Sequence, residues 1–195
     1  MCVALVHMGA RVGKAAAIAG PTILLIVFAL FAFSYLISTL AGLPVFLGLP
    51  LVMNVLGGVI VVAGLVLIGW VFRYRSPASM IASTYVTFAK LFRKIPIAEA
   101  SNRTEPLIVG GPHKYVRNPL YFGVIVMVFG WALVGGYTFV LVAAFVILLW
   151  FRFVLIPFEE KELRAIFGEQ YAKYADEVPM LFPFTKRRRS SAHVD

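Results

Sequence analysis

Charged residues and cysteine are both scarce in this sequence. Only 14% of its 195 residues are charged, 61% are apolar, and the mean hydropathy is +0.90. A soluble domain of this length cannot bury so much apolar surface, so the composition indicates an integral membrane protein. The single cysteine, Cys2, excludes an intrachain disulfide, and the three histidines lie too far apart in sequence to show metal-ligand spacing. We therefore expect no metal site.

Four apolar runs are long enough to suggest membrane crossings, since ~20 helical residues span the hydrocarbon core. We expect spans at about 15–41, 51–72, 119–134 and 137–157. The first run is too long for the apolar core of a signal peptide, so we expect it to be retained. Gly135 and Gly136 break the last apolar stretch into a helical hairpin. The prediction is a single all-α membrane domain with about four transmembrane helices and interfacial amphipathic helices.

The positive charges predict the orientation of these spans. Of the 18 lysines and arginines, two precede the first span, eight lie within 73–118, and eight lie from Arg152 onward. The loop 42–50 and the Gly135-Gly136 turn contain none. By the positive-inside rule, both termini and the segment 73–118 are cytoplasmic. All nine acidic residues fall in the same parts, so we expect the active site to face the cytoplasm as well.

Two segments show the apolar spacing of amphipathic helices. Residues 79–95 end in several basic residues and predict an interfacial helix on anionic headgroups. A second interpretation is that this helix also walls a lipid-entry cleft. Residues 158–177 carry an apolar stripe and predict a cytoplasmic helix that folds back on the membrane face. The basic tail 185–195 is expected to be disordered and to contact anionic lipid. No folded reader domain precedes it, so we expect no nucleic-acid partner.

Two polar clusters flank the predicted hairpin. The stretch "GGPHKYVRNPLYFG" leads into the third span, and Glu159 and Glu160 follow the fourth. A hairpin brings these two ends together. Adjacent carboxylates at membrane depth are unfavourable unless they are paired or bind a ligand. Two interpretations stay open on this evidence: a salt bridge between Arg117 and the glutamates that locks the hairpin, or a ligand site.

These two clusters also carry a resemblance. "GGPHKYVRNPLYFG" and "EEKELRAIFGEQYAKYADEVPMLFP", within residues 103–183, resemble two ordered motifs of the isoprenylcysteine carboxyl methyltransferase and phospholipid methyltransferase families. The resemblance implies an enzyme that binds S-adenosylmethionine in a pocket over the hairpin, closed by the C-terminal helix. It further implies methyl transfer to a lipophilic acceptor, either an isoprenylcysteine-type carboxylate or a lipid amine.

The resemblance also implies site residues. Those implied to bind the cofactor are Glu105, Pro106, Leu107, Ile108, His113, Tyr115, Arg117, Asn118, Pro119, Leu120, Tyr121 and Glu160, with Glu159 beside the last. Asn118 replaces a family histidine and cannot titrate, which argues against proton transfer there. His113 replaces an aromatic residue and can still stack on adenine. The family's substrate arginine corresponds to Ile156, so we expect Arg152, one turn earlier, to orient the acceptor.

Two rival functions stay open at this point. One is an NADPH-dependent oxidoreductase related to membrane sterol reductases, for which Lys114 and Arg117 offer positive charge to a cofactor phosphate. The other is a non-catalytic membrane protein that uses the hairpin for binding. Small residues such as Gly57 and Gly64 are common in membrane helices and leave the oligomeric state undetermined.

Overall fold

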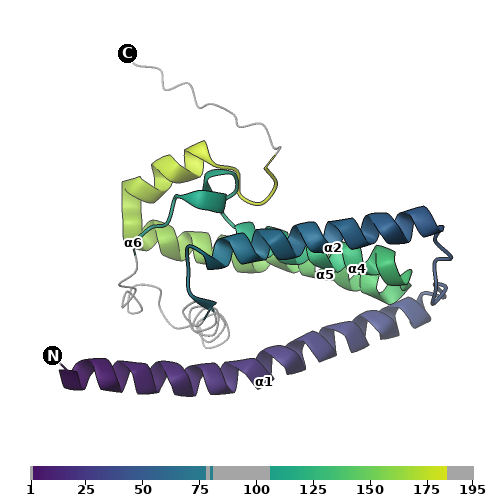
Figure 1. The fold of residues 1–195 in the computed structure, drawn as a ribbon, viewed down its shortest axis with the longest axis horizontal. Coiled ribbons are helices and arrows are strands. Elements are labelled where there is room, and N and C mark those ends of the chain that lie inside the picture. Colours follow the sequence, from purple (N-terminus) through teal and green to yellow (C-terminus); the bar gives the residue numbers. More distant parts are fainter. Residues whose placement is uncertain (1, 78–79, 81–105, 184–195) are drawn as a thin grey trace, which may run out of the picture.

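The computed structural model describes residues 2–77, 80 and 106–183. Figure 1 shows an all-helical arrangement in these ranges, which confirms the predicted fold class. The elements are α1 (Cys2–Leu40), α2 (Leu51–Phe72), the short 3₁₀ helix η2 (Gly111–Lys114), α4 (Pro119–Gly135), α5 (Thr138–Trp150), the π-helical turn η3 (Phe151–Leu155) and α6 (Ile156–Glu177). The predicted interfacial helix 79–95, the basic tail 185–195 and Glu105 lie outside the described residues.

Three of the helical stretches are long and apolar enough to cross a membrane: Pro21–Leu40, Leu51–Phe72 and Thr138–Glu177. Helix α4 is equally apolar but shorter, with 17 residues. Large apolar side chains such as Leu24, Phe28 and Leu51 stay more than two thirds exposed. Exposed apolar surface on this scale suits contact with lipid rather than water.

The last stretch differs from the predicted boundary at residue 158. Helix α5, the turn η3 and helix α6 follow one another without a break from Thr138 to Glu177. The chain changes direction instead at Gly168, which has φ 51° and ψ −125°. Glycine adopts a positive φ without steric conflict, whereas other residues rarely do. As a result, the second half of α6 folds back across the end of the bundle and lies next to η2 (Figure 1).

Glycine pairs hold α2 and α4 together in antiparallel contact. A Cβ on Gly57 would lie 2.8 Å from the Gly130 carbonyl oxygen, and one on Gly64 would lie 3.0 Å from that of Gly123. The two backbones therefore approach each other directly, as small residues permit in membrane helices. The glycines that left the oligomeric state open in sequence are used here for packing within one chain.

The loop before α2 pairs with the hairpin turn at the end of the bundle that lacks charged residues. Leu47 donates its backbone N–H to the Gly136 carbonyl at 2.8 Å, and Thr138 donates to the Val45 carbonyl at 3.1 Å. Helix α1 joins this end through Tyr35, whose ring lies edge-on to Phe139. These contacts fix one end of the bundle and leave the other end to form the site.

Candidate functional site

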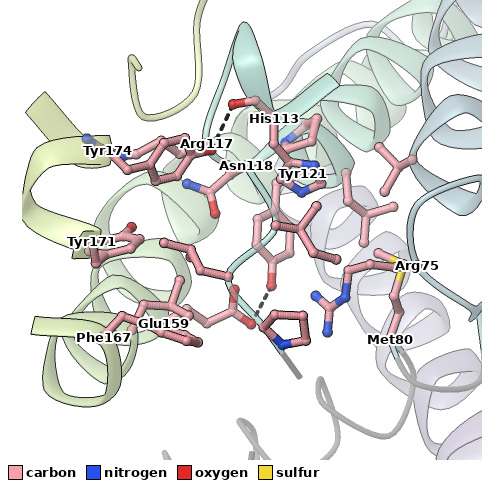
Figure 2. A pocket seen from close by; sticks show the side chains of 17 residues that line it. Arg75, Met80, His113, Arg117, Asn118, Tyr121, Glu159, Phe167, Tyr171 and Tyr174 are labelled. Atoms are coloured by element: carbon pink, nitrogen blue, oxygen red, sulfur yellow. Dashed lines mark hydrogen bonds between the residues drawn. The ribbon is translucent and has the colours of Figure 1, made fainter. Parts of the chain in front are cut away.

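A half-open cavity lies at the opposite end of the bundle (Figure 2). The end of α2, η2, the start of α4 and both halves of α6 enclose it. Its empty space, including the open mouth, is about 890 Å³. The lining residues are Val71, Arg75, Met80, Pro106, Leu107, Ile108, His113, Arg117, Asn118, Pro119, Leu120, Tyr121, Glu159, Leu163, Phe167, Tyr171 and Tyr174.

Arg117, which lines the cavity, forms a two-point ion pair with Glu160, which does not. Arg117 Nε donates to Glu160 Oε1 at 2.9 Å and Nη2 donates to Oε2 at 3.0 Å. Asn118 Nδ2 adds a third donor to Oε1 at 3.3 Å. The side chains of Arg117 and Glu160 are only 10% and 7% exposed. Several donors around one buried carboxylate offset its loss of hydration. The hairpin-locking salt bridge is therefore present, and Glu160 is its acid.

Arg117 and Asn118 also hold the end of α6 and the residues that follow it. We call residues 175–181 the C-terminal strap. Arg117 donates its backbone N–H to the Pro179 carbonyl at 2.9 Å and its Nη1 to the Ala175 carbonyl. Asn118 Nδ2 donates to the Met180 carbonyl at 3.0 Å. Leu181, 2% exposed, packs in the core at the strap's end. The Arg-Asn pair thus fastens the strap to the start of α4.

Glu159 has a different position from its neighbour. It lines the cavity and accepts a hydrogen bond from the Tyr121 hydroxyl at 2.8 Å. Successive helical residues point ~100° apart, so one glutamate of the pair faces the cavity while the other faces Arg117. Figure 2 shows the Glu159 carboxylate and the Tyr121 hydroxyl meeting at the edge of the cavity.

His113 lies in η2, and its backbone is held on both sides. Its N–H donates to the Gly110 carbonyl at 3.2 Å, and its carbonyl accepts from the Tyr174 hydroxyl at 2.8 Å. Its Nδ1 is buried without a hydrogen-bond partner among the described residues. Burial, then the positive charge of Arg75, lower the pKa of His113 from 6.5 to about 4, against a smaller opposing effect of its Gly110 hydrogen bond. The imidazole is therefore neutral at physiological pH.

Tyr74 supports the turn before η2. Gly111 has φ 57°, and a Cβ there would lie 2.4 Å from the Tyr74 ring. Gly111 thus allows close approach of an aromatic ring from the end of α2. This contact joins the end of α2 to η2.

Many of the residues that the sequence grouped as one candidate site line this cavity. Those predicted and found at the cavity are Pro106, Leu107, Ile108, His113, Arg117, Asn118, Pro119, Leu120, Tyr121 and Glu159. The apolar stripe of 158–177 supplies Leu163, Phe167, Tyr171 and Tyr174, so helical spacing was the signal that could have assigned them. No such signal marked Val71, Arg75 or Met80. In the sequence, Arg75 counted only among the basic residues that predict the orientation of the spans.

Three predicted residues do not line the cavity. Glu160 faces Arg117. Tyr115 is 60% exposed, with its ring 6.0 Å from that of Trp70. Arg152 is exposed in η3, where its guanidinium lies 5.4 Å from the Phe153 ring centre. The ligand roles predicted for these three residues remain predictions, and Arg152 would need a substrate that reaches outside the cavity.

Comparison with known proteins matches this region. The phospholipid methyltransferase family model matches residues 78–170, slightly less than half of the chain. Residues 78–170 are thus similar to phospholipid methyltransferases, and we call them the family segment. This family segment contains η2, α4, α5, η3 and the first half of α6, and so most of the cavity wall.

A curated relative shares part of the chain. A methanethiol S-methyltransferase from Crocosphaera subtropica is 38% identical over 80 residues, which are 39% of this chain and 29% of the relative. The chain thus spans less than a third of the length of this curated relative. No solved structure matches the chain.

Proposed function

We propose that this protein is an integral membrane methyltransferase that uses S-adenosylmethionine and methylates a lipophilic acceptor at the cytoplasmic face. The observation that carries the proposal is the convergence of His113, Tyr121 and Glu159, from two separate sequence motifs, on one cavity within the family segment. The excess of basic residues at this end supports the cytoplasmic orientation.

The cavity's donor set fits S-adenosylmethionine. The ligand carries an ammonium and a sulfonium, and Glu159 offers a carboxylate to positive charge. Phe167, Tyr171 and Tyr174 supply aromatic surface that favours both cations and an adenine ring. His113 has a buried Nδ1 whose hydrogen bond is unmade in the described residues. When bound, S-adenosylmethionine supplies a methyl group already activated by its sulfonium.

We assign the two glutamates different roles. Glu159, oriented by the Tyr121 hydroxyl, is the carboxylate that meets the ligand's positive charge. Glu160 is a positioning residue, because it holds Arg117 and Asn118, which in turn fasten the C-terminal strap. This differs from the role that family resemblance implied for Glu160.

The chain's main catalytic contribution is orientation of the two reactants. Holding reacting groups in line can supply ~7–11 kcal/mol of the barrier. Proton transfer is less suited to this site. Asn118 cannot titrate, and a histidine whose pKa lies at about 4 is a weak base toward an ammonium. A carboxylate acceptor needs no base, whereas a lipid amine must arrive deprotonated or lose its proton to another group.

The NADPH-dependent alternative relied on Lys114 and Arg117 to bind a nucleotide phosphate. Arg117 is held by Glu160, and Lys114 is exposed and does not line the cavity. The described residues therefore offer less for a dinucleotide phosphate than the sequence suggested.

The test is incubation of the purified protein in lipid nanodiscs with methyl-labelled S-adenosylmethionine and total membrane lipid, followed by identification of the labelled species. We expect label in a lipophilic product, and strongly reduced label with Glu159→Gln. Calorimetry should detect S-adenosylmethionine binding and no NADPH binding. Binding of NADPH alone, with no label transferred, would overturn the proposal.

A further inference from the structure

Two arginines line the cavity in the described part of the chain, Arg75 and Arg117, and they are used differently. The guanidinium of Arg117 makes two hydrogen bonds to Glu160 and one to the Ala175 carbonyl. That network pairs its charge with a carboxylate of the protein. Arg75 lines the cavity from the end of α2.

Local structure fixes where Arg75 lies. Its backbone N–H donates to the Val71 carbonyl at 3.2 Å, which continues the last turn of α2. The preceding Tyr74 packs its ring against Gly111, so the end of α2 is held against η2. Figure 2 shows Arg75 reaching the cavity from one wall and Glu159 from the opposite wall. The cavity thus has a positive and a negative side.

The charge of Arg75 acts inside the cavity. It is the second cause, after burial, of the lowered pKa of His113, which lines the same wall. A partly buried guanidinium with this reach attracts anions more strongly than an exposed one, since the surrounding dielectric is lower. Arg73, two residues earlier, is exposed and does not line the cavity.

We propose that Arg75 binds a carboxylate of a ligand in this cavity, while Glu159 meets a positive group on the opposite wall. The inference rests on the proposed function and adds that the cavity binds negative and positive groups of its ligands on opposite walls. Two sources supply a carboxylate there: the amino-acid part of S-adenosylmethionine, or an acceptor that is itself a carboxylate. The guanidinium of arginine suits either, because its paired N–H groups match the two oxygens of a carboxylate.

The first arm of the test measures binding of S-adenosylmethionine and of its decarboxylated analogue by calorimetry. If the cofactor supplies the carboxylate, wild-type protein prefers S-adenosylmethionine. Arg75→Gln then weakens its binding about 10- to 100-fold, the range expected for a lost charge-assisted hydrogen bond. Binding of the decarboxylated analogue stays unchanged, so the preference disappears. Arg75→Lys, which retains the positive charge, keeps part of the preference for S-adenosylmethionine over the decarboxylated analogue.

The second arm measures methyl transfer to a carboxylate-bearing lipophilic acceptor and to a neutral one. If the acceptor supplies the carboxylate, Arg75→Gln raises KM for the carboxylate acceptor about 10- to 100-fold and leaves both the neutral acceptor and cofactor binding unchanged. Arg73→Gln is the matched control and should behave as wild type in both arms. Thermal melting of each variant identifies any loss of folding.

The outcomes separate the two proposals. A wild-type protein that binds no S-adenosylmethionine overturns the proposed function and the role of Arg75 with it. A wild-type protein that binds and transfers methyl, with Arg75→Gln and Arg75→Lys unchanged in both arms, overturns only the role of Arg75. If Arg75→Gln fails to fold, Arg75→Lys decides, because it must then alter one of the two carboxylate preferences.

Discussion

Arg117 and Glu160 lie 43 residues apart in sequence and share two hydrogen bonds, at 2.9 and 3.0 Å, between nearly buried side chains. This contact joins the entry of α4 to the start of α6. It also positions the arginine that donates to the strap at Ala175 and Pro179. The polar signature before α4 therefore has a structural function as well as the ligand-binding one proposed for its neighbours.

Removal of either partner of this pair should destabilise the protein. Arg117→Gln or Glu160→Gln leaves a buried charge without its partner, at a cost of about 3–5 kcal/mol. The double variant should lose less than the sum of the two single variants, since it leaves no lone charge. Thermal or denaturant unfolding in detergent measures all three. Losses that simply add would show that the ion pair is not coupled in the folded protein.

Glu159 and Glu160 should separate binding from stability. We expect Glu159→Gln to weaken S-adenosylmethionine binding about 10- to 100-fold with little change in melting temperature, because it lines the cavity and removes a charge-assisted contact. Tyr121→Phe should have a smaller effect in the same direction. Glu160→Gln should lower the melting temperature first. Calorimetry and thermal melting give both values, and the reverse pattern would restore Glu160 as the cofactor carboxylate.

His113 should make stability depend on pH in a defined window. Its pKa is about 4 in the folded protein and 6.5 in the unfolded chain, so the unfolded chain binds its proton first as the pH falls. Stability from this group is therefore complete above pH 6.5 and is lost between about 6.5 and 4. Comparison of melting curves for wild type and His113→Gln isolates this loss from that of the carboxylates. Parallel pH profiles would show that the histidine titrates normally.

The glycine contacts between α2 and α4 should not tolerate a methyl group. A Cβ on Gly57 would lie 2.7 Å from Leu133 Cβ and 2.8 Å from the Gly130 carbonyl oxygen, whereas Gly58 has nothing within 4 Å. We expect Gly57→Ala to cost about 1–3 kcal/mol through overpacking and Gly58→Ala to be neutral or slightly stabilising. Thermal melting of the two variants in one detergent makes the comparison. Equal melting temperatures would mean that the helices adjust their separation.

The contact between Gly57 and Gly130 could not be predicted from the sequence. Apolar run length, charge asymmetry and the two motifs are local properties, so they predicted an all-helical membrane fold and brought His113, Tyr121 and Glu159 into one candidate site. A glycine's partner is not a local property. Gly57 could have faced lipid, another chain or Gly130, and only the packing of α2 on α4 distinguishes these.

The sequence by itself determined the helical class of this protein, its apolar membrane character and the similarity of residues 78–170 to phospholipid methyltransferases, because hydropathy, charge and motif order are local properties of the chain. The tertiary structure decided which adjacent glutamate faces the cavity, since neighbouring helical residues point ~100° apart and only packing sets the helix's rotation. It also brought Arg75 to His113, because the Tyr74–Gly111 contact joins segments separated by more than 30 residues.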